Sequence, residues 1–238
     1  MGSTASLLRK SVARAPAAAA KKEQQYASLS ELVYRKMREA IQQGALRPGQ
    51  RIMEIEVAEW LKVSRTPVRE ALRRLESDGM LSLEPRTGLV VASLSRQAML
   101  ELYVMREVLE GTAARLCARH ASDLEVMELE ELVKREERLR GDFEELVRHN
   151  RLFHEAVHRG AHNRYLEKSL SAVNDSMWLL GKSQMLLPHR AQAALAEHGE
   201  LLAAIRKHDP DAAEEAARRH VRSAQKERLK QLFPETRD

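Results

Sequence analysis

Hydrophobic positions between residues 29 and 79 predict three helices. Apolar residues recur every three or four positions from Leu29 to Ile41, and Gly44 ends this run. The stretches EIEVAEWLK and VSRTPVREALRRLESDG predict two further helices, the last of which ends at Gly79. The second helix is expected to bury three residues: Ile55, Ala58 and Leu61.

The pattern changes after Gly79. Two short apolar runs, Met80–Leu83 and Leu89–Ala92, flank the turn-forming residues 85–88. Apolar runs of this length around a turn predict a β-hairpin. Three helices followed by a hairpin are the outline of a winged helix-turn-helix.

From Ser95 onward the apolar spacing is helical throughout, and Gly and Pro residues mark the breaks between helices. The predicted helices are 95–120, 122–140, 142–160, 163–181, 189–208 and 210–232. The expected fold is therefore mainly α, with an N-terminal winged helix-turn-helix at 26–93 and an all-helical bundle at 94–232. Residues 1–25 are expected to form a disordered arm, and residues 233–238 a tail.

Composition supports a helical protein that works in the cytoplasm. Aromatic residues make up only 4% of the chain and charged residues 32%. The single cysteine, Cys117, excludes an intrachain disulfide and fits a reducing compartment, and its apolar surroundings predict a core residue. No apolar run approaches the roughly 20 residues needed to span a bilayer, so no membrane association is expected.

The third predicted helix has an apolar stripe on one side and basic residues on the other. Residues 62–86 contain six basic residues against four acidic ones, although the whole chain carries a net charge of only +5. Arg65, Thr66, Arg69 and Arg73 lie opposite the stripe, where a recognition helix presents side chains to DNA. Arg86 lies at the predicted hairpin tip, within reach of the adjacent DNA backbone or minor groove. An arginine-rich surface helix without a nucleic-acid role is the alternative.

The segment VSRTPVREALRRLESDGML closely resembles the recognition segment of the GntR family of bacterial regulators, and the resemblance covers residues 29–92. It implies that Arg65, Thr66 and Arg69 contact DNA and that Arg86 and Gly88 belong to the wing. Ile55 departs from the family pattern, since many members carry an arginine there that helps to recognise the operator.

The stretch LFHEAVHRGAH contains His154-Glu155-Ala156-Val157-His158, the H-E-x-x-H pattern of zinc proteases. At about 100° per residue, His154 falls inside the apolar stripe of its helix, His158 falls at the margin, and Glu155 points roughly 140° away. The further ligands of known protease classes are missing from the expected positions. The pattern therefore predicts no proteolysis.

Three histidines interrupt the apolar stripes of three different helices: His154, His198 and His220. A single histidine of this kind is usually a buried, hydrogen-bonded core residue. Three of them in one bundle, with Asn150 one turn before His154, predict a site for a first-row divalent metal.

The stretches LYVMREVLEGTAARL, NRLFHEAVHRGAHNRYL, EHGELLAAI and RRHVRS resemble the FCD effector domain of FadR-type GntR regulators. The resemblance implies a metal, zinc or nickel, held by Asn150, His154, His198 and His220, with asparagine replacing the usual aspartate. It also implies a small carboxylate effector. Arg106 is a candidate clamp for that carboxylate, or else a surface arginine paired with Glu110, and Asn174 is a candidate lining residue.

These features predict a homodimeric, ligand-responsive repressor that binds a near-palindromic double-stranded operator. Two alternatives stay open at this stage. One is a metal-dependent helical hydrolase built on His154, Glu155 and His158. The other is an architectural DNA-binding protein whose helical bundle binds no effector.

Overall fold

The computed structural model describes residues 17–139, 141–181 and 183–233. Two units fold around separate cores: residues up to Ile41 with Gly49–Val91, and residues 42–48 with those from Ala92 onward. Each is described by itself. The predicted arm at 1–25 lies partly outside the described residues. Helix α2 (Ala17–Gln42) begins well before Tyr26, where order was expected to start.

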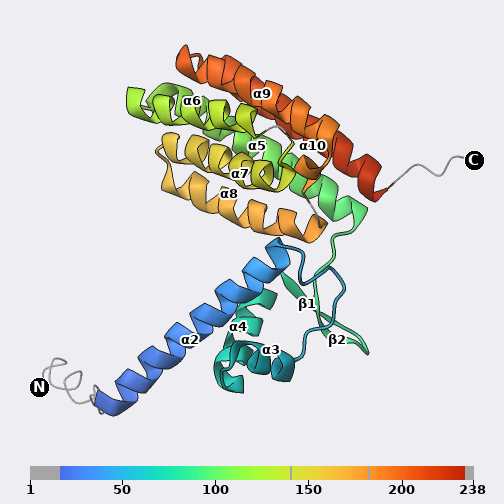
Figure 1. The fold of residues 1–238 in the computed structure, drawn as a ribbon. Coiled ribbons are helices and arrows are strands. Elements are labelled where there is room, and N and C mark those ends of the chain that lie inside the picture. The colour runs from blue at the N-terminus through green and yellow to red at the C-terminus, as the bar shows by residue number, and fades with distance from the viewer. Residues whose placement is uncertain (1–16, 140, 182, 234–238) are drawn as a thin grey trace, which may run out of the picture. The chain divides into compact units, whose positions relative to one another are not determined.

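The first unit is a winged helix-turn-helix (Figure 1). Helix α2 is followed by α3 (Glu54–Leu61) and α4 (Arg65–Ser77), and then by the antiparallel strands β1 (Leu81–Glu84) and β2 (Gly88–Val91). The core of this unit includes fully buried side chains from α2, α4 and the hairpin: Val33, Met37, Val68, Leu75 and Val91. The predicted order of three helices and a hairpin is confirmed.

The hairpin is tied to the segment before α3. The N–H of Ile52 donates to the carbonyl of Leu89 at 2.8 Å, which adds a short third edge to the two strands. Its tip requires the left-handed backbone conformation, at φ 72° for Arg86 and 84° for Gly88. The side chain of Arg86 is exposed at this tip.

The expected burial of Ile55 is wrong. Ile55 is 49% exposed, whereas Val57 and Ala58 are buried and Leu61 is half-buried. At about 100° per residue, Ile55 lies about 160° from Val57 around α3, so it cannot share the buried face centred on that residue. The helix is too short for its apolar spacing to define the buried face reliably.

The second unit is all-helical, and its helix bounds lie within a few residues of those predicted. The helices are α5 (Arg96–His120), α6 (Asp123–Arg138), α7 (Phe143–Gly160), α8 (Arg164–Met177), α9 (Pro188–Arg206) and α10 (Pro210–Leu232). Two 3-10 turns, η1 (Trp178–Leu180) and η2 (Gln184–Leu186), separate α8 from α9, so the predicted helix at 163–181 ends earlier than expected. Ser122 begins α6 with a capping box, in which its side chain and that of Glu125 each bond the other's backbone N–H.

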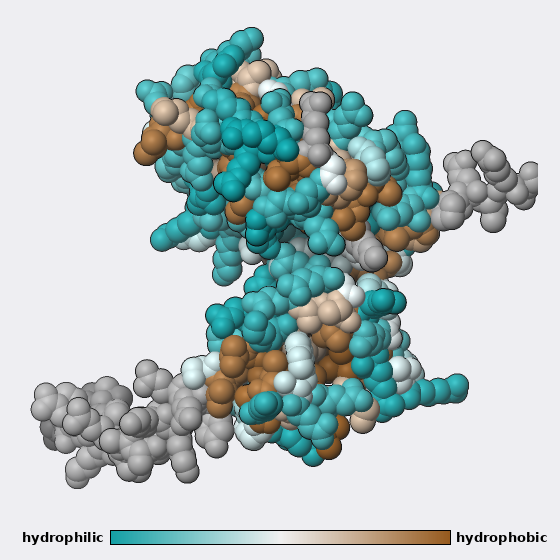
Figure 2. Space-filling view, in the orientation of Figure 1, coloured by the Kyte–Doolittle hydropathy of each residue, from teal (hydrophilic) through white to brown (hydrophobic). Residues whose placement is uncertain are grey.

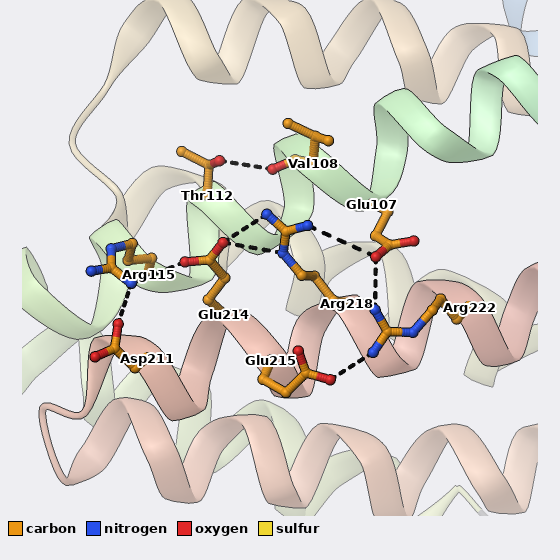
Figure 3. A network of polar contacts seen from close by, with 9 residues as sticks. All are labelled: Glu107, Val108, Thr112, Arg115, Asp211, Glu214, Glu215, Arg218 and Arg222. Carbon is orange, nitrogen blue, oxygen red and sulfur yellow. Dashed lines mark hydrogen bonds and ion pairs between the residues drawn. The ribbon is translucent and has the colours of Figure 1, made fainter.

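Helix α5 packs against α7, α8, α9 and α10. Small side chains, including Ala114 on α5 and Ala213 and Ala217 on α10, belong to one core cluster and allow close approach. Figure 3 shows the charged network that borders this contact, in which Arg218 of α10 pairs with Glu214 at 2.7 Å and with Glu107 of α5 at 3.9 Å. Exposed ion pairs contribute little stability, so the apolar core is the main source of this packing.

Hydrophilic residues dominate the face of the molecule seen in Figure 2. Within the part of the chain that the structure describes, no helix is long and apolar enough to cross a membrane.

We expect the Gly160→Ala substitution to destabilise the protein by about 1–3 kcal/mol, because overpacking a dense core costs energy of that order. A Cβ atom at Gly160 would lie 2.7 Å from Sγ of the buried Cys117. Burial raises the pKa of this thiol to about 12, which fits the predicted core residue. Urea unfolding of Gly160→Ala, Cys117→Ala and the double variant measures the effect. Adding Gly160→Ala to Cys117→Ala should cost little stability, because the Sγ atom is then gone.

Gly199→Ala is the matched control, because a Cβ atom at Gly199 meets nothing within 4 Å. This change should stabilise slightly, since alanine favours a helix over glycine by up to about 1 kcal/mol. An equal penalty for Gly160→Ala with and without Cys117 would contradict the assigned contact.

Candidate metal centre and DNA-binding surface

Three histidines predicted as metal ligands meet in the interior of the helical unit. His154 comes from α7, His198 from α9 and His220 from α10, and all three are buried. The ring centroids of His154 and His198 are 5.3 Å apart, and each lies 5.0 Å from that of His220. One ring nitrogen from each lies within 4.8 Å of the other two. The helical spacing thus identified a real cluster.

Each of these histidines has a carboxylate beside its Nδ1 atom. His198 donates from Nδ1 to the fully buried Glu136 at 2.8 Å, and His220 donates to Glu197 at 2.7 Å. His154 Nδ1 lies 3.5 Å from Glu110 on α5. A carboxylate at Nδ1 holds the proton of the imidazole on that nitrogen. The lone pair of Nε2 can then bind a metal, as in known carboxylate–histidine–metal arrangements.

Burial favours the neutral form of His154 and His220, which is the form that binds metals. Desolvation lowers the pKa of His154, and it lowers the pKa of His220 well below the usual value, with neighbouring His198 adding to the effect at His220. The Nε2 atoms of His154 and His198 are buried without a hydrogen-bond partner among the described residues. Unpaired buried nitrogens are costly, and a divalent metal would satisfy both. The residues present therefore fit such an ion.

A second group shares His154 with the first. Glu110 lies 2.9 Å from Nε2 of His158 as well as 3.5 Å from Nδ1 of His154. Burial alone would raise the pKa of Glu110, but His158 and His154 hold it well below its usual range. The ionised carboxylate therefore joins two histidines of one helix, and His158 is more deeply buried than the marginal position expected for it.

The glutamate of the H-E-x-x-H pattern points away from this centre, as expected. Glu155 is exposed and lies 3.5 Å from Arg151 one turn earlier on α7. It therefore cannot act on a substrate held at the buried histidines. His154 and His158 share the pattern but face Glu110 instead.

One buried and one mostly buried arginine accompany the histidines. The side chain of Arg106 on α5 is only 13% exposed, and its Nε atom lies 3.6 Å from Oε1 of Glu110. Arg106 therefore pairs with Glu110, but it is not a surface residue. Arg190 on α9 is buried, pairs with Glu197 at 2.8 Å and lies 3.5 Å from His220. Nε of Arg106 and Nη1 of Arg190 have no hydrogen-bond partner within the described chain. Nη1 of Arg190 is therefore a donor available to an anion, whereas Nε of Arg106 faces the carboxylate of Glu110.

The two predicted asparagines are half-buried. Asn150 lies on α7 one turn before His154, and Asn174 lies on α8. Their roles as ligand and lining residue stay predictions.

Sequence reasoning missed Glu110 as a partner of His154, and it missed Glu136, Glu197 and Arg190 altogether. Glu136 continues the apolar series Val126, Leu129 and Val133 of α6, and Arg190 precedes Ala194 and His198 by whole turns of α9. A polar residue in line with an apolar stripe was the signal that identified the histidines, and the same signal marks Glu136 and Arg190.

The predicted DNA-contact residues lie on one accessible helix and its wing. Arg65, Thr66, Arg69 and Arg73 are exposed on α4, while Pro67 and Val68 between them are buried. Gly88 is half-buried at the start of β2, close in sequence to the exposed Arg86. Glu54, the first residue of α3, holds both Arg65 and Arg69 by ion pairs, an interaction that the sequence did not indicate.

Known proteins similar to this chain are transcriptional regulators. A model of the FCD domain matches residues 101–223, and a model for bacterial regulatory proteins of the gntR family matches residues 29–91. An uncharacterized HTH-type transcriptional regulator of Bacillus subtilis, YdhC, is 35% identical over 191 residues, which are 79% of this chain and 84% of that protein. A probable D-xylose utilization operon transcriptional repressor of Paenarthrobacter nicotinovorans is 33% identical and covers 76% of this chain and 80% of its own.

The fold has solved counterparts. The structure of Escherichia coli McbR/YncC has a TM-score of 0.75 and 26% identity, and the match covers 85% of this chain and 98% of that chain. These relatives are transcriptional regulators rather than enzymes, which overturns the hydrolase alternative. The chain belongs to the GntR family of bacterial transcriptional regulators and carries an FCD domain after its DNA-binding domain.

Proposed function

We propose that this DNA-binding regulator is a cytoplasmic repressor whose operator affinity is controlled by a small carboxylate bound beside a divalent metal. The observation that carries the proposal is the buried histidine cluster, in which Nδ1 of each histidine lies beside a carboxylate and Nε2 of His154 and His198 has no hydrogen-bond partner in the described part of the chain. Repression rather than activation is supported by the Paenarthrobacter relative, which is described as a probable repressor.

On DNA, Arg65, Thr66, Arg69 and Arg73 of α4 would contact the major groove, with Arg86 and Gly88 of the wing at the adjacent backbone. The exposure of the four arginines and Thr66, and the positive charge of the arginines, support this assignment. Phosphate contacts would supply much of the affinity and make it depend on salt, whereas contacts to base edges would select the sequence.

The protein would act as a homodimer on a near-palindromic operator, with half-sites roughly one helical turn apart. Support for a dimer comes from α5, where Val104, Met105 and Val108 are 59%, 51% and 42% exposed. Three large apolar residues on neighbouring positions of one helix favour a protein contact over solvent.

In the helical unit, His154, His198 and His220 would hold zinc or nickel, with Asn150 as a neutral fourth ligand. When bound, such an ion offers a coordination position to an oxygen donor. Glu136 and Glu197 orient His198 and His220. Arg106 and Arg190 supply positive charge for a carboxylate, and Asn174 is a candidate for a further polar contact.

The effector would change DNA affinity by preferring one arrangement of the helices. Arg106 and Glu110 lie on α5, and His220 and Arg190 lie on α10 and α9. A carboxylate that draws the cationic side chains of Arg106 and Arg190 together would bias the bundle toward that arrangement. The shift in DNA affinity can be no larger than the ligand's difference in affinity for the two arrangements.

Replacing Arg65 and Arg69 by Ala together should abolish operator binding, because both charge and base contacts are lost. A duplex selected by the unmodified protein from a randomised library serves as the operator. Binding is measured at fixed salt, and mass measurement of the complex should give two chains per duplex. Arg135→Ala with Arg138→Ala, which removes two exposed charges from α6, is the control and should bind normally. Unchanged binding by the α4 variant would sink the assignment.

His198→Ala should eliminate stoichiometric metal binding, and Glu136→Gln should weaken it by about 10- to 100-fold, since loss of a carboxylate partner has that typical effect. Metal content by elemental analysis and competition with a chelator measure both. His189→Ala is the control, because His189 is an exposed histidine of the same helix. Equal metal content in all three variants would rule out this site.

A screen of small carboxylic acids should raise the melting temperature of the metal-loaded protein and shift its operator affinity. Ligands that bind only the folded state stabilise it by mass action. Arg106→Gln should weaken both responses because it removes a mostly buried cation beside Glu110, the carboxylate that contacts His154 and His158. If no acid changes either quantity, the bundle is effector-blind and the architectural alternative holds.

A further inference from the structure

One carboxylate holds both arginines at the start of the recognition helix. Glu54 is the first residue of α3, Arg65 is the first residue of α4, and Arg69 lies one turn later. Arg69 donates from Nε to Oε1 at 2.9 Å and from Nη2 to Oε2 at 3.0 Å. Arg65 donates from Nη2 to Oε2 at 3.1 Å. The helix-turn-helix thus brings an acid onto its own candidate DNA-contact residues.

The geometry at Arg69 leaves one edge of the guanidinium available. An arginine carries five N–H donors in a rigid planar fork. The edge formed by Nε and Nη2 is bound to Glu54, so the edge formed by Nη1 and the second N–H of Nη2 remains for another partner. The side chain of Arg69 is 51% exposed. A two-donor edge of this kind matches O6 and N7 of guanine in the major groove.

Stability alone does not account for the acid. Glu54 is 29% exposed, and exposed ion pairs contribute at most about 1 kcal/mol to folding. Hydrogen bonding from Arg69 lowers the pKa of Glu54 to about 2, so the group is ionised at physiological pH. A fixed negative charge beside two arginines weakens their attraction to phosphate. An acid here therefore opposes non-specific DNA binding.

We propose that Glu54 is a positioning residue for sequence recognition: it directs the free edge of Arg69 to a guanine and reduces the affinity for DNA of unrelated sequence. The inference rests on the proposed contact of Arg65 and Arg69 with DNA. Glu54 acts through these arginines. Its effect is therefore on the ratio of specific to non-specific affinity.

The test compares Glu54→Gln with Glu56→Gln. Glu56 lies in the same first turn of α3 and is exposed, so its replacement removes an equal charge, and no ion pair of Glu56 occurs among the described residues. Each variant is titrated at fixed salt with a duplex selected by the unmodified protein from a randomised library, and with a scrambled duplex of the same composition. Thermal unfolding checks that both variants fold.

Both variants should bind the scrambled duplex somewhat more tightly. Only Glu54→Gln should lower the ratio of specific to non-specific affinity, by about five- to a hundredfold, the range for loss of one bidentate base contact. Replacing guanines of the selected duplex by 7-deazaguanine removes the N7 acceptor. It should weaken binding by the unmodified protein and by Glu56→Gln, but much less by Glu54→Gln.

An unchanged ratio for Glu54→Gln, or an equal fall for both variants, would overturn the inference, as would a full 7-deazaguanine penalty in Glu54→Gln. In an Arg69→Ala background, Glu54→Gln should cause little additional loss of specificity; an additive loss would count against action through Arg69. A different result would contradict the proposed function itself: normal binding of the selected duplex by the Arg65→Ala, Arg69→Ala double variant.

Discussion

The helical unit depends on how charged and polar side chains are paired away from water. Five of its helices bring polar groups to one buried cluster: Glu110 from α5, Glu136 from α6, His154 from α7, His198 from α9 and His220 from α10. An unpaired polar group in such a place costs several kilocalories per mole, so each member constrains its neighbours. The carboxylates satisfy the Nδ1 side of His198 and His220, whereas the Nε2 atoms of His154 and His198 have no hydrogen-bond partner among the residues that the structure describes. In the proposed mechanism, an ion bound between the histidines would therefore bias the arrangement of the helices.

The proposed bias has a covalent route to the DNA-binding unit. Strand β2 ends at Val91 and α5 begins at Arg96, so the wing leads directly into the helix that carries Arg106 and Glu110. The same helix packs against α7, α9 and α10, which hold the three histidines. In the proposed mechanism, α5 is thus the element on which ligand binding and DNA binding both act. Its small residues and the close contact of Cys117 with Gly160 leave little space for gradual adjustment, which favours discrete arrangements.

Much of this architecture follows from local sequence signals. Helix bounds followed apolar spacing, glycine breaks and caps, and the histidines stood out because they interrupt apolar stripes. The failures have a common cause. Ile55 was assigned to a core because an eight-residue helix has too few turns to define its buried face. Glu136 was not singled out because glutamate is common on helices, and its partner His198 lies 62 residues away. Pairings across such distances depend on how helices pack, which a single helix's pattern does not contain.

The two units use one chemical arrangement in different surroundings. In the helical unit, Glu136 orients the nitrogen donor of His198 in a dry interior. In the winged unit, Glu54 orients the guanidinium of Arg69 in contact with water. Low dielectric makes the buried pair energetically large, so its loss should be felt in stability as well as in ligand binding. Solvent screens the exposed pair, so its contribution to folding is small. Its proposed effect is to orient the guanidinium of Arg69. The same carboxylate chemistry is thus expected to couple folding to ligand binding in one unit and to govern only sequence choice in the other.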